Sequence, residues 1–188
     1  AVGHRWAMPT PMPEEAKSLV VLDAQADKEK IAGAVDFIFC AVDMKKEEIR
    51  ALEEAYAKLE CPVVSNNSAH RWTPDVPMVI AVKSNCSIQS YAPALHPLRS
   101  YGLERVLVCT YQAISGAGKT FETWPEIVDN VVPYIGGEEE KSEQEPLKVW
   151  GKVEKGQIVP ALSPSITAQC LRVPVSDGHT AAVFVSFQ

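Results

Sequence analysis

Two apolar runs flank a helical pattern in residues 35–66, VDFIFCAVDMKKEEIRALEEAYAKLECPVVSN. The first run, 35–42, is almost continuously apolar, which is typical of a strand buried on both faces of a parallel sheet. Charged and apolar residues recur with helical spacing over 45–59, and residues 61–66 have a second strand pattern. This order predicts a β-α-β unit. The short apolar run 19–22 predicts another buried parallel strand before it.

The two predicted strands of this unit end in small or polar residues, at 40–43 and 65–67. In open α/β sheets, ligands bind beyond the carboxyl ends of the strands, and this β-α-β order is similar to the later half of a nucleotide-binding sheet. We therefore expect both strand ends to face a ligand.

The second half of the chain has longer strand patterns than the first. We expect helices over 87–98 (with Ser87 as N-cap), over 123–134 and from 138 towards 148, and strands over 103–112, 168–175 and 180–187. Long alternating strands with helices to one side predict an α+β catalytic domain. We place the domain boundary near Cys86, which gives domains of residues 1–85 and 86–188. Residues 76–80 and 81–86 both predict strands with no turn between them. They form either one unusually long strand or two strands whose connecting loop is missing, and we expect the missing loop.

The composition excludes some classes of protein. The chain has 188 residues, is 46% hydrophobic and carries a formal net charge of −6, so it can bury a core but offers no general surface for nucleic acid or an anionic membrane. No apolar run approaches the ~20 residues that span a bilayer, which predicts a soluble protein. Five scattered cysteines lack the spacing of a metal site, so we expect no metal and a reducing, cytoplasmic location.

Cys86 is the candidate nucleophile. It lies between polar residues at the expected start of a helix, whereas the other four cysteines lie in or at the start of apolar runs and are expected to be buried. A helix N-terminus and a protonated His179 would lower the pKa of the Cys86 thiol from about 8.5. Spacing alone leaves open an inert thiol in a polar turn, and a surface histidine after the turn signal Asp177-Gly178.

Several charged residues are candidates for binding an anionic substrate. Arg172 lies among apolar strand residues, where a cation needs a partner or a function. Glu138 and Lys141 are one helical turn apart and could face the same pocket, although a Glu-Glu-Glu-Lys run is more often a solvated face. Arg71 lies in a predicted loop, where it either meets phosphate or has no specific role.

Residues 115–120, SGAGKT, are similar to a phosphate-binding loop but do not complete its motif. The motif requires a glycine five positions before the Gly-Lys pair, where this chain has Ala113. We expect instead that Gly116 and Gly118 let a flat ligand approach the backbone closely.

Taken together, these motifs resemble the aspartate-β-semialdehyde dehydrogenases of archaea, fungi and many bacteria. The resemblance covers essentially the whole chain and is carried by Ser65-Asn66, His70-Arg71, Pro74-Asp75-Val76-Pro77, Ser84-Asn85-Cys86-Ser87, residues 111–118, Glu138-Glu139-Glu140-Lys141 and residues 172–179. It implies the reduction of L-aspartyl 4-phosphate with NADPH to L-aspartate 4-semialdehyde and phosphate, in the biosynthesis of lysine, threonine and methionine.

The resemblance also implies roles for individual residues. Cys86 would attack the acyl phosphate to form a thioester, His179 would act as acid and base, and Gln112 would orient the acyl group. For the substrate, the resemblance implies Arg172 at the α-carboxylate, Glu138 at the ammonium group, and Lys141, Arg71 and Asn85 at the phosphate. For NADP it implies Ser65, Asn66, Ser115, Gly116 and Gly118.

The implied fold combines α/β and α+β parts. It is a partial Rossmann-type NADP-binding domain, residues 1–85, followed by a catalytic and dimerisation domain like that of glyceraldehyde-3-phosphate dehydrogenase, residues 86–188. The implied assembly is a homodimer. The chain departs from the family pattern in three places: it has no glycine-rich cofactor turn near its start, no substantial loop between 77 and 83, and no long helix at its end. We therefore expect that it is part of a longer enzyme.

Three other functions remain open. A sister reductase acting on another acyl phosphate, such as N-acetylglutamyl phosphate, would not need Arg172 and the Glu138/Lys141 pair, which suit a free amino acid. A cofactor-free cysteine hydrolase using Cys86, His179 and Asn85 would leave the predicted strand ends without a role. A catalytically inactive fragment that binds a partner would not need an intact thiol and histidine.

Overall fold

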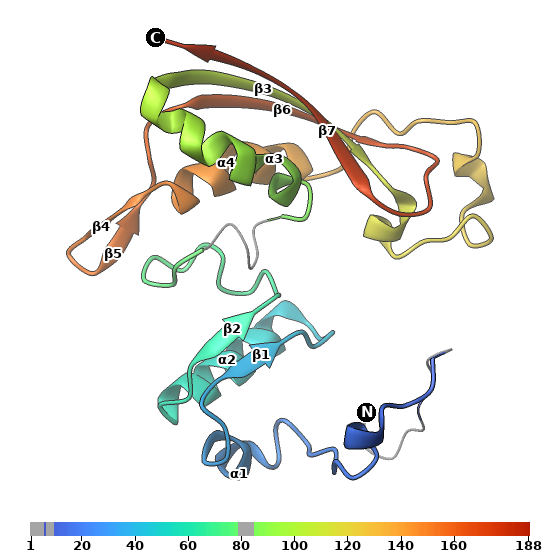
Figure 1. Cartoon of the computed structure of the whole chain (residues 1–188), viewed down its shortest axis with the longest axis vertical. Helices are drawn as coiled ribbons and strands as arrows, with labels where there is room; N and C mark the ends of the chain where they lie inside the picture. The colour runs from blue at the N-terminus through green and yellow to red at the C-terminus, as the bar shows by residue number, and fades with distance from the viewer. Residues whose placement is uncertain (1–5, 7–9, 79–84) are drawn as a thin grey trace. The chain divides into compact units, whose positions relative to one another are not determined.

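The computed structural model describes residue 6 and residues 10–78 and 85–188. These residues form two compact units, 1–69 and 70–188, and each is described by itself (Figure 1). The strand junction predicted over 76–86 lies largely outside the described residues. The compact units are separated after residue 69, whereas the boundary predicted after residue 85 separates sequence domains. That domain boundary stays a prediction.

The first unit contains the predicted β-α-β order, with shorter strands than expected. β1 (Ile38–Cys40) and β2 (Val63–Ser65) pair in parallel, and α2 (Lys46–Lys58) connects them. The Glu48 carboxylate accepts the Lys45 N–H and so caps the start of α2. Buried residues Leu52, Tyr56 and Cys61 form the centre of a small core against which α1 (Lys28–Ala32) packs. A short 3₁₀ turn, η1 (Glu14–Ala16), precedes them.

The strand predicted over residues 19–22 is wrong. Leu19 and Val20 are 73% and 81% exposed, and the described part of this segment contains no strand. A buried strand needs a hydrogen-bonded neighbour, and among the described residues β1 pairs only with β2. The Asp23 carboxylate instead accepts the N–H groups of Gln25 and Ala26, which turns the chain towards α1.

The second unit is built on a three-stranded sheet in the order β6-β3-β7 (Figure 1). β3 (Leu103–Gln112) pairs in parallel with β6 (Ser165–Arg172) and antiparallel with β7 (His179–Phe187). Helices α3 (Ile88–Leu98) and α4 (Glu138–Val149) lie on one face of the sheet. The prediction of long strands with helices to one side is therefore confirmed. The remaining elements are η2 (Arg99–Tyr101), η3 (Ile114–Ala117), η4 (Pro125–Ile127), β4 (Lys152–Glu154) and β5 (Gln157–Val159).

Alternation along β3 separates a buried from an exposed face of this sheet. Val106 and Val108 are buried in the core with Ile88 and Leu95 of α3, whereas Leu107 between them is exposed. The period of two is what a strand with one covered face requires. The alternation therefore fixes which β3 side chains can reach a site under the helices.

The helix predicted over 123–134 is also wrong, since only the single turn η4 forms there. Pro133 has no N–H to donate, and Asp129 adopts a left-handed backbone with φ of 57°. Between them, Val132 exchanges two backbone hydrogen bonds with Arg172, of 3.0 and 2.9 Å. The segment thus pairs with the end of β6 instead of forming a helix.

α4 covers the outer edge of β6 with carboxylates. Glu139 accepts the Cys170 N–H and Glu143 accepts the Ala168 N–H, both at 3.0 Å. An unpaired strand edge is a site of unwanted association, and these contacts satisfy it within the chain. The acidic start of α4 is therefore not simply a solvated face.

Candidate active site

The register of the sheet brings three predicted site residues into one row. Gln112, the last residue of β3, lies opposite Arg172 of β6 and also opposite His179 of β7. Side chains of directly paired residues lie on the same face of a sheet. Since Gln112 is almost fully buried on the face covered by α3 and α4, the row lies under these helices. It combines an amide, a guanidinium and an imidazole.

Ala113, directly after the row, fixes two of these side chains through its backbone. Its N–H donates to Nδ1 of His179 at 3.1 Å, and its carbonyl oxygen accepts Nη1 of Arg172 at 2.7 Å. Because Nδ1 accepts, the neutral imidazole carries its proton on Nε2. His179 is the first residue of β7 and follows Gly178, which has φ of +88°, as the predicted turn requires.

Gly116 lies against the other side of the same two side chains. A Cβ at this position would be 2.9 Å from Nη1 of Arg172 and 3.0 Å from Nε2 of His179. Arg172 and His179 therefore leave no room for a side chain at residue 116. The sequence did not predict this requirement. Gly118 has φ of +66° and no atom within 4 Å of such a Cβ.

Cys86 is the exposed thiol of the second unit, whereas Cys170 is fully buried. Burial raises the pKa of Cys170, and also that of Cys40 in the first unit, so both thiols are poor nucleophiles. Burial lowers the pKa of Arg172, while the charges of Glu138 and Cys86 act to raise it.

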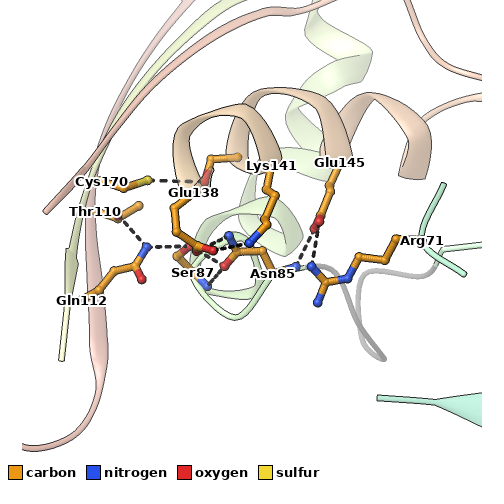
Figure 2. Close-up of polar contacts among 10 residues, drawn as sticks. Arg71, Asn85, Ser87, Thr110, Gln112, Glu138, Lys141, Glu145 and Cys170 are labelled. Carbon is orange, nitrogen blue, oxygen red and sulfur yellow. Dashed lines mark hydrogen bonds and ion pairs between the residues drawn. The ribbon is translucent and has the colours of Figure 1, made fainter. Parts of the chain in front are cut away.

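The turn that carries Cys86 is held from both sides (Figure 2). Oδ1 of Asn85 accepts the Ser87 N–H at 2.9 Å and the Ser87 hydroxyl at 2.7 Å. The Ser87 hydroxyl also accepts Nε2 of Gln112 at 3.2 Å. Ser87 occupies the predicted N-cap position of α3 but makes no capping bond, because its hydroxyl is used in these two contacts. The turn is thus linked to the row in the sheet.

Glu138 binds both Lys141 and Asn85 (Figure 2). Oε1 of Glu138 pairs with Nζ of Lys141 at 2.7 Å, and Oε2 accepts Nδ2 of Asn85 at 2.6 Å. Burial raises the pKa of Glu138, but Lys141 and the side-chain amides of Asn85 and Gln112 together outweigh burial and hold it below its ordinary value. The carboxylate is therefore ionised at neutral pH and pairs with one cation, Lys141.

Arg71 and Glu145 form a buried ion pair in the same unit. Nη1 of Arg71 lies 2.9 Å from Oε1 of Glu145, whose side chain is fully buried. Nε of Arg71 is also buried and has no hydrogen-bond partner among the described residues. The guanidinium thus keeps donor capacity that the described residues do not use.

The five predicted cofactor residues are divided between the two units. Ser65 and Asn66 lie at the carboxyl end of β2 in the first unit, where Ser65 donates to the Glu53 carboxylate and the Asn66 N–H donates to the Cys40 carbonyl. Ser115, Gly116 and Gly118 lie in and after η3 in the second unit. Each unit places its own residues at the end of a strand, as expected for a ligand site.

Sequence reasoning missed Ser87 as a link between segments, and it missed Glu145. The spacing of Glu138, Lys141, Glu145 and Lys148 would have placed all four on one face of a helix.

In the part of the chain that the structure describes, no group of three or more His, Cys, Asp or Glu side chains could hold a metal ion. None of the described helices is both long enough and apolar enough to span a membrane.

Comparison with known proteins identifies the family. Residues 1–89 match the NAD binding domain of semialdehyde dehydrogenases, and residues 95–188 match their dimerisation domain. The aspartate-semialdehyde dehydrogenases of Methanothermobacter thermautotrophicus and Archaeoglobus fulgidus are 36% and 34% identical to the chain, over 96% and 97% of its length. They are matched over 57% and 58% of their own lengths, so the chain spans less than two thirds of these relatives.

A solved structure is similar to the chain over the same extent. It is that of aspartate semialdehyde dehydrogenase with NADP from Candida albicans, with a TM-score of 0.77 and 27% identity over 97% of this chain and 59% of that one. The predicted fold, a Rossmann-like nucleotide-binding part followed by a dimerisation domain, is thereby confirmed. On this evidence, the chain belongs to the semialdehyde dehydrogenase family, and its relatives named here are aspartate-semialdehyde dehydrogenases.

Proposed function

We propose that the protein containing this chain catalyses the NADP-dependent reductive dephosphorylation of L-aspartyl 4-phosphate to L-aspartate 4-semialdehyde and phosphate. The observation that carries the proposal is the row of Arg172, Gln112 and His179 linked through Ser87 to the turn that bears Cys86. The row supplies a hydrogen-bond donor for the acyl oxygen, a proton donor and a carboxylate binder, and the linked turn supplies an exposed thiol. The relatives' names support the same reaction.

Cys86 forms the thioester in this proposal. The thiol first loses its proton to solvent, and the thiolate sulfur then bonds to the acyl carbon of the substrate. The bond between that carbon and the phosphate oxygen breaks, so phosphate leaves with the electron pair. The Gln112 amide orients the acyl oxygen. His179 presents a proton on Nε2, which suits donation to the oxyanion or to the sulfur as it departs.

The charged groups suit an amino-acid substrate. Arg172 can bind the α-carboxylate with two parallel hydrogen bonds, a geometry that lysine does not offer. Glu138 takes the ammonium group, and Lys141, Asn85 and Arg71 take the phosphate. Because Glu138 is bound to Lys141 and Asn85 here, a zwitterionic substrate exchanges those contacts for its own ammonium and phosphate. The site thus keeps its charges paired before and after binding.

For NADP, we propose the five residues that the family resemblance implies, with each unit considered by itself. Ser65 and Asn66 follow a parallel strand, and Ser115, Gly116 and Gly118 expose backbone after β3. NADPH supplies a hydride when bound. These five residues hold it in this proposal, and the open space beside Gly118 lets it approach the backbone.

We also propose that the protein forms a homodimer through the uncovered face of the sheet. Leu107 and Phe184 lie opposite each other on that face and are 54% and 70% exposed in the single chain. The family description of residues 95–188 as a dimerisation domain supports this assembly. Exposed apolar patches on a sheet are typical of association surfaces.

Five free thiols suit a reducing compartment, and we place the protein in the cytoplasm.

The test is phosphate-dependent reduction of NADP⁺ by L-aspartate 4-semialdehyde, with the full-length protein that contains this sequence. Cys86→Ala is expected to lower kcat by at least about 10³-fold, since the nucleophile is lost. Cys109→Ala, at a half-buried thiol on the opposite face of the sheet, is the matched control and is expected to retain activity. Activity on N-acetyl-L-glutamate 5-semialdehyde instead would identify the sister reductase. Turnover that survives Cys86→Ala would exclude the thioester.

A further inference from the structure

One face of α4 carries four charged residues, and only two of them have a role so far. Glu138, Lys141, Glu145 and Lys148 follow each other at intervals of three, four and three residues, which places them on one side of the helix. Glu138 and Lys141 belong to the proposed substrate site. Glu145 and Lys148 are buried, and charged side chains are rarely buried without a reason. Their contacts show what they hold.

Glu145 connects two segments that are separate in the sequence. Its Oε1 accepts Nη1 of Arg71 at 2.9 Å, and its Oε2 accepts the backbone N–H of Asn85 at 2.6 Å (Figure 2). Asn85 directly precedes Cys86. One carboxylate therefore sets the distance between a proposed phosphate-binding cation and the turn that carries the proposed nucleophile.

Lys148 holds the same arginine by its backbone. Its Nζ donates to the carbonyl oxygens of Arg71 at 2.5 Å and of Thr73 at 2.8 Å. Burial lowers the pKa of Lys148, so the ammonium group depends on these acceptors for its stability. Arg71 is thus held at its side chain by Glu145 and at its main chain by Lys148, from one helix.

We propose that Glu145 is a positioning residue for phosphate binding, with Lys148 as its support; this inference rests on the proposed function. Glu145 binds one nitrogen of Arg71 and so fixes the plane of the guanidinium, whose Nε has no hydrogen-bond partner among the described residues. The Arg71 side chain is 13% exposed, which leaves it an accessible edge for a phosphate oxygen. The same carboxylate keeps the Asn85 peptide, and hence Cys86, at a fixed distance from that nitrogen. Glu145 itself does not touch the substrate.

If Glu145 had a different role, removal of its carboxylate would change the affinity for phosphate in the opposite direction. If the carboxylate only neutralised the site, its removal would strengthen the local positive potential and tighten anion binding. If it positions Arg71, its removal leaves the guanidinium without its fixed orientation, and anion binding weakens. The direction of the change in phosphate affinity therefore decides between the two roles.

The experiment compares Glu145→Gln with Glu140→Gln, an exposed neighbour on α4, in the full-length protein. Two readouts are measured: the KM for inorganic phosphate in semialdehyde oxidation, and the phosphate concentration that half-protects Cys86 from iodoacetamide. We expect both to rise about tenfold in Glu145→Gln and to stay unchanged in Glu140→Gln. The KM for the semialdehyde should change less than twofold, a split that general loss of packing would not produce.

Arg71→Gln provides the second variant. If Glu145 acts through Arg71, the double variant should bind phosphate about as weakly as Arg71→Gln alone. Should Glu145→Gln fail to fold, Glu145→Asp keeps the charge and is expected to show the same split with a smaller rise. Unchanged or tighter phosphate binding in a folded Glu145 variant would overturn the inference. A wild-type protein without phosphate dependence and without protection of Cys86 would instead overturn the proposed function.

Discussion

The two faces of the β6-β3-β7 sheet are built from the same three strands but have opposite surroundings. The face under α3 and α4 holds the core and ends in the row of Gln112, Arg172 and His179. The other face leaves Leu107 and Phe184 exposed in the single chain. Successive strand residues alternate between faces. Neighbours in the sequence can therefore serve chemistry on one face and association on the other.

This difference shows that residues of the proposed site and of the proposed dimer surface alternate along the same strand. Tyr111, next to Gln112, lies on the outer face, and Leu107, next to Val106, lies there as well. A shift of one residue in the pairing of β3 would exchange the two faces. The pairing register of β3 therefore determines both which side chains lie in the site and which lie on the proposed dimer surface.

The largest effect is expected from aspartate substitutions at adjacent positions of β3. Val106→Asp buries an unpaired carboxylate at a fully inaccessible position and is expected to destabilise the chain by at least about 4 kcal/mol. Leu107→Asp places the same group at a position that is 54% exposed, with an expected change below about 1 kcal/mol in the monomer. Urea unfolding followed by the fluorescence of the buried Trp150 measures both changes.

The mass of the Leu107→Asp protein in solution completes this comparison. We expect it to be folded and monomeric under conditions in which the wild type is a dimer, because a charge on an apolar contact surface opposes association. A folded Leu107→Asp dimer would show that assembly uses another surface. Equal destabilisation by the two substitutions would show that the faces are not distinguished by burial.

A smaller effect is expected from alanine at Gly116, directly behind the row on the inner face. The new methyl group would lie 2.9 Å from Nη1 of Arg172, which cannot retreat without loosening its 2.7 Å bond to the Ala113 carbonyl. We expect kcat/KM to fall about 10- to 100-fold, since small displacements of catalytic groups have effects of this size. The melting temperature should change little.

Gly136→Ala is the matched control, since its added methyl group would meet no atom within 4 Å. It is expected to keep full activity. If Gly116→Ala were equally active, the contacts of Arg172 and His179 with residue 116 would be irrelevant to turnover.

Much of the fold could be predicted from the sequence, because local patterns determine it. β3 and α2 form where the period-two and helical patterns are long and uninterrupted. Residues 19–22 and 123–134 were mispredicted because their structure depends on distant partners. The first run has no neighbouring strand among the described residues, and the second pairs with the end of β6 through Val132.

The site could be predicted only in part, for the same reason. Arg172 and Cys86 were identifiable as residues out of keeping with their surroundings, a buried cation and a thiol in a polar turn. That Gln112 joins Arg172 to His179 follows from the pairing register, which no local pattern specifies. The contacts of Glu145 likewise depend on packing between segments about 60 residues or more apart. The roles of the predicted site residues stay proposals.

The smallest expected effect concerns pH and the Glu138 carboxylate on the inner side of the sheet. Its pKa is lowered in the folded chain, because Lys141 and two amides outweigh the effect of burial. A carboxyl group whose folded pKa lies below its unfolded pKa stabilises the fold above the unfolded value, and this contribution is lost as the pH falls through the folded pKa. Glu138→Gln should therefore lower the free energy of unfolding by about 1 kcal/mol at pH 7.

The difference between wild type and Glu138→Gln should then shrink as the pH is lowered past about 4.3, the ordinary value for glutamate, since the wild-type carboxyl becomes neutral as well. Urea unfolding at a series of pH values between 7 and 3 measures it. Glu140→Gln, an exposed carboxyl in the same turn of α4, should show no such trend. A difference that stays constant or grows on acidification would mean that Glu138 is not held ionised by Lys141 and Asn85. Among the charged groups on the covered face of the sheet, Arg172 alone would then support the proposed binding of an amino acid.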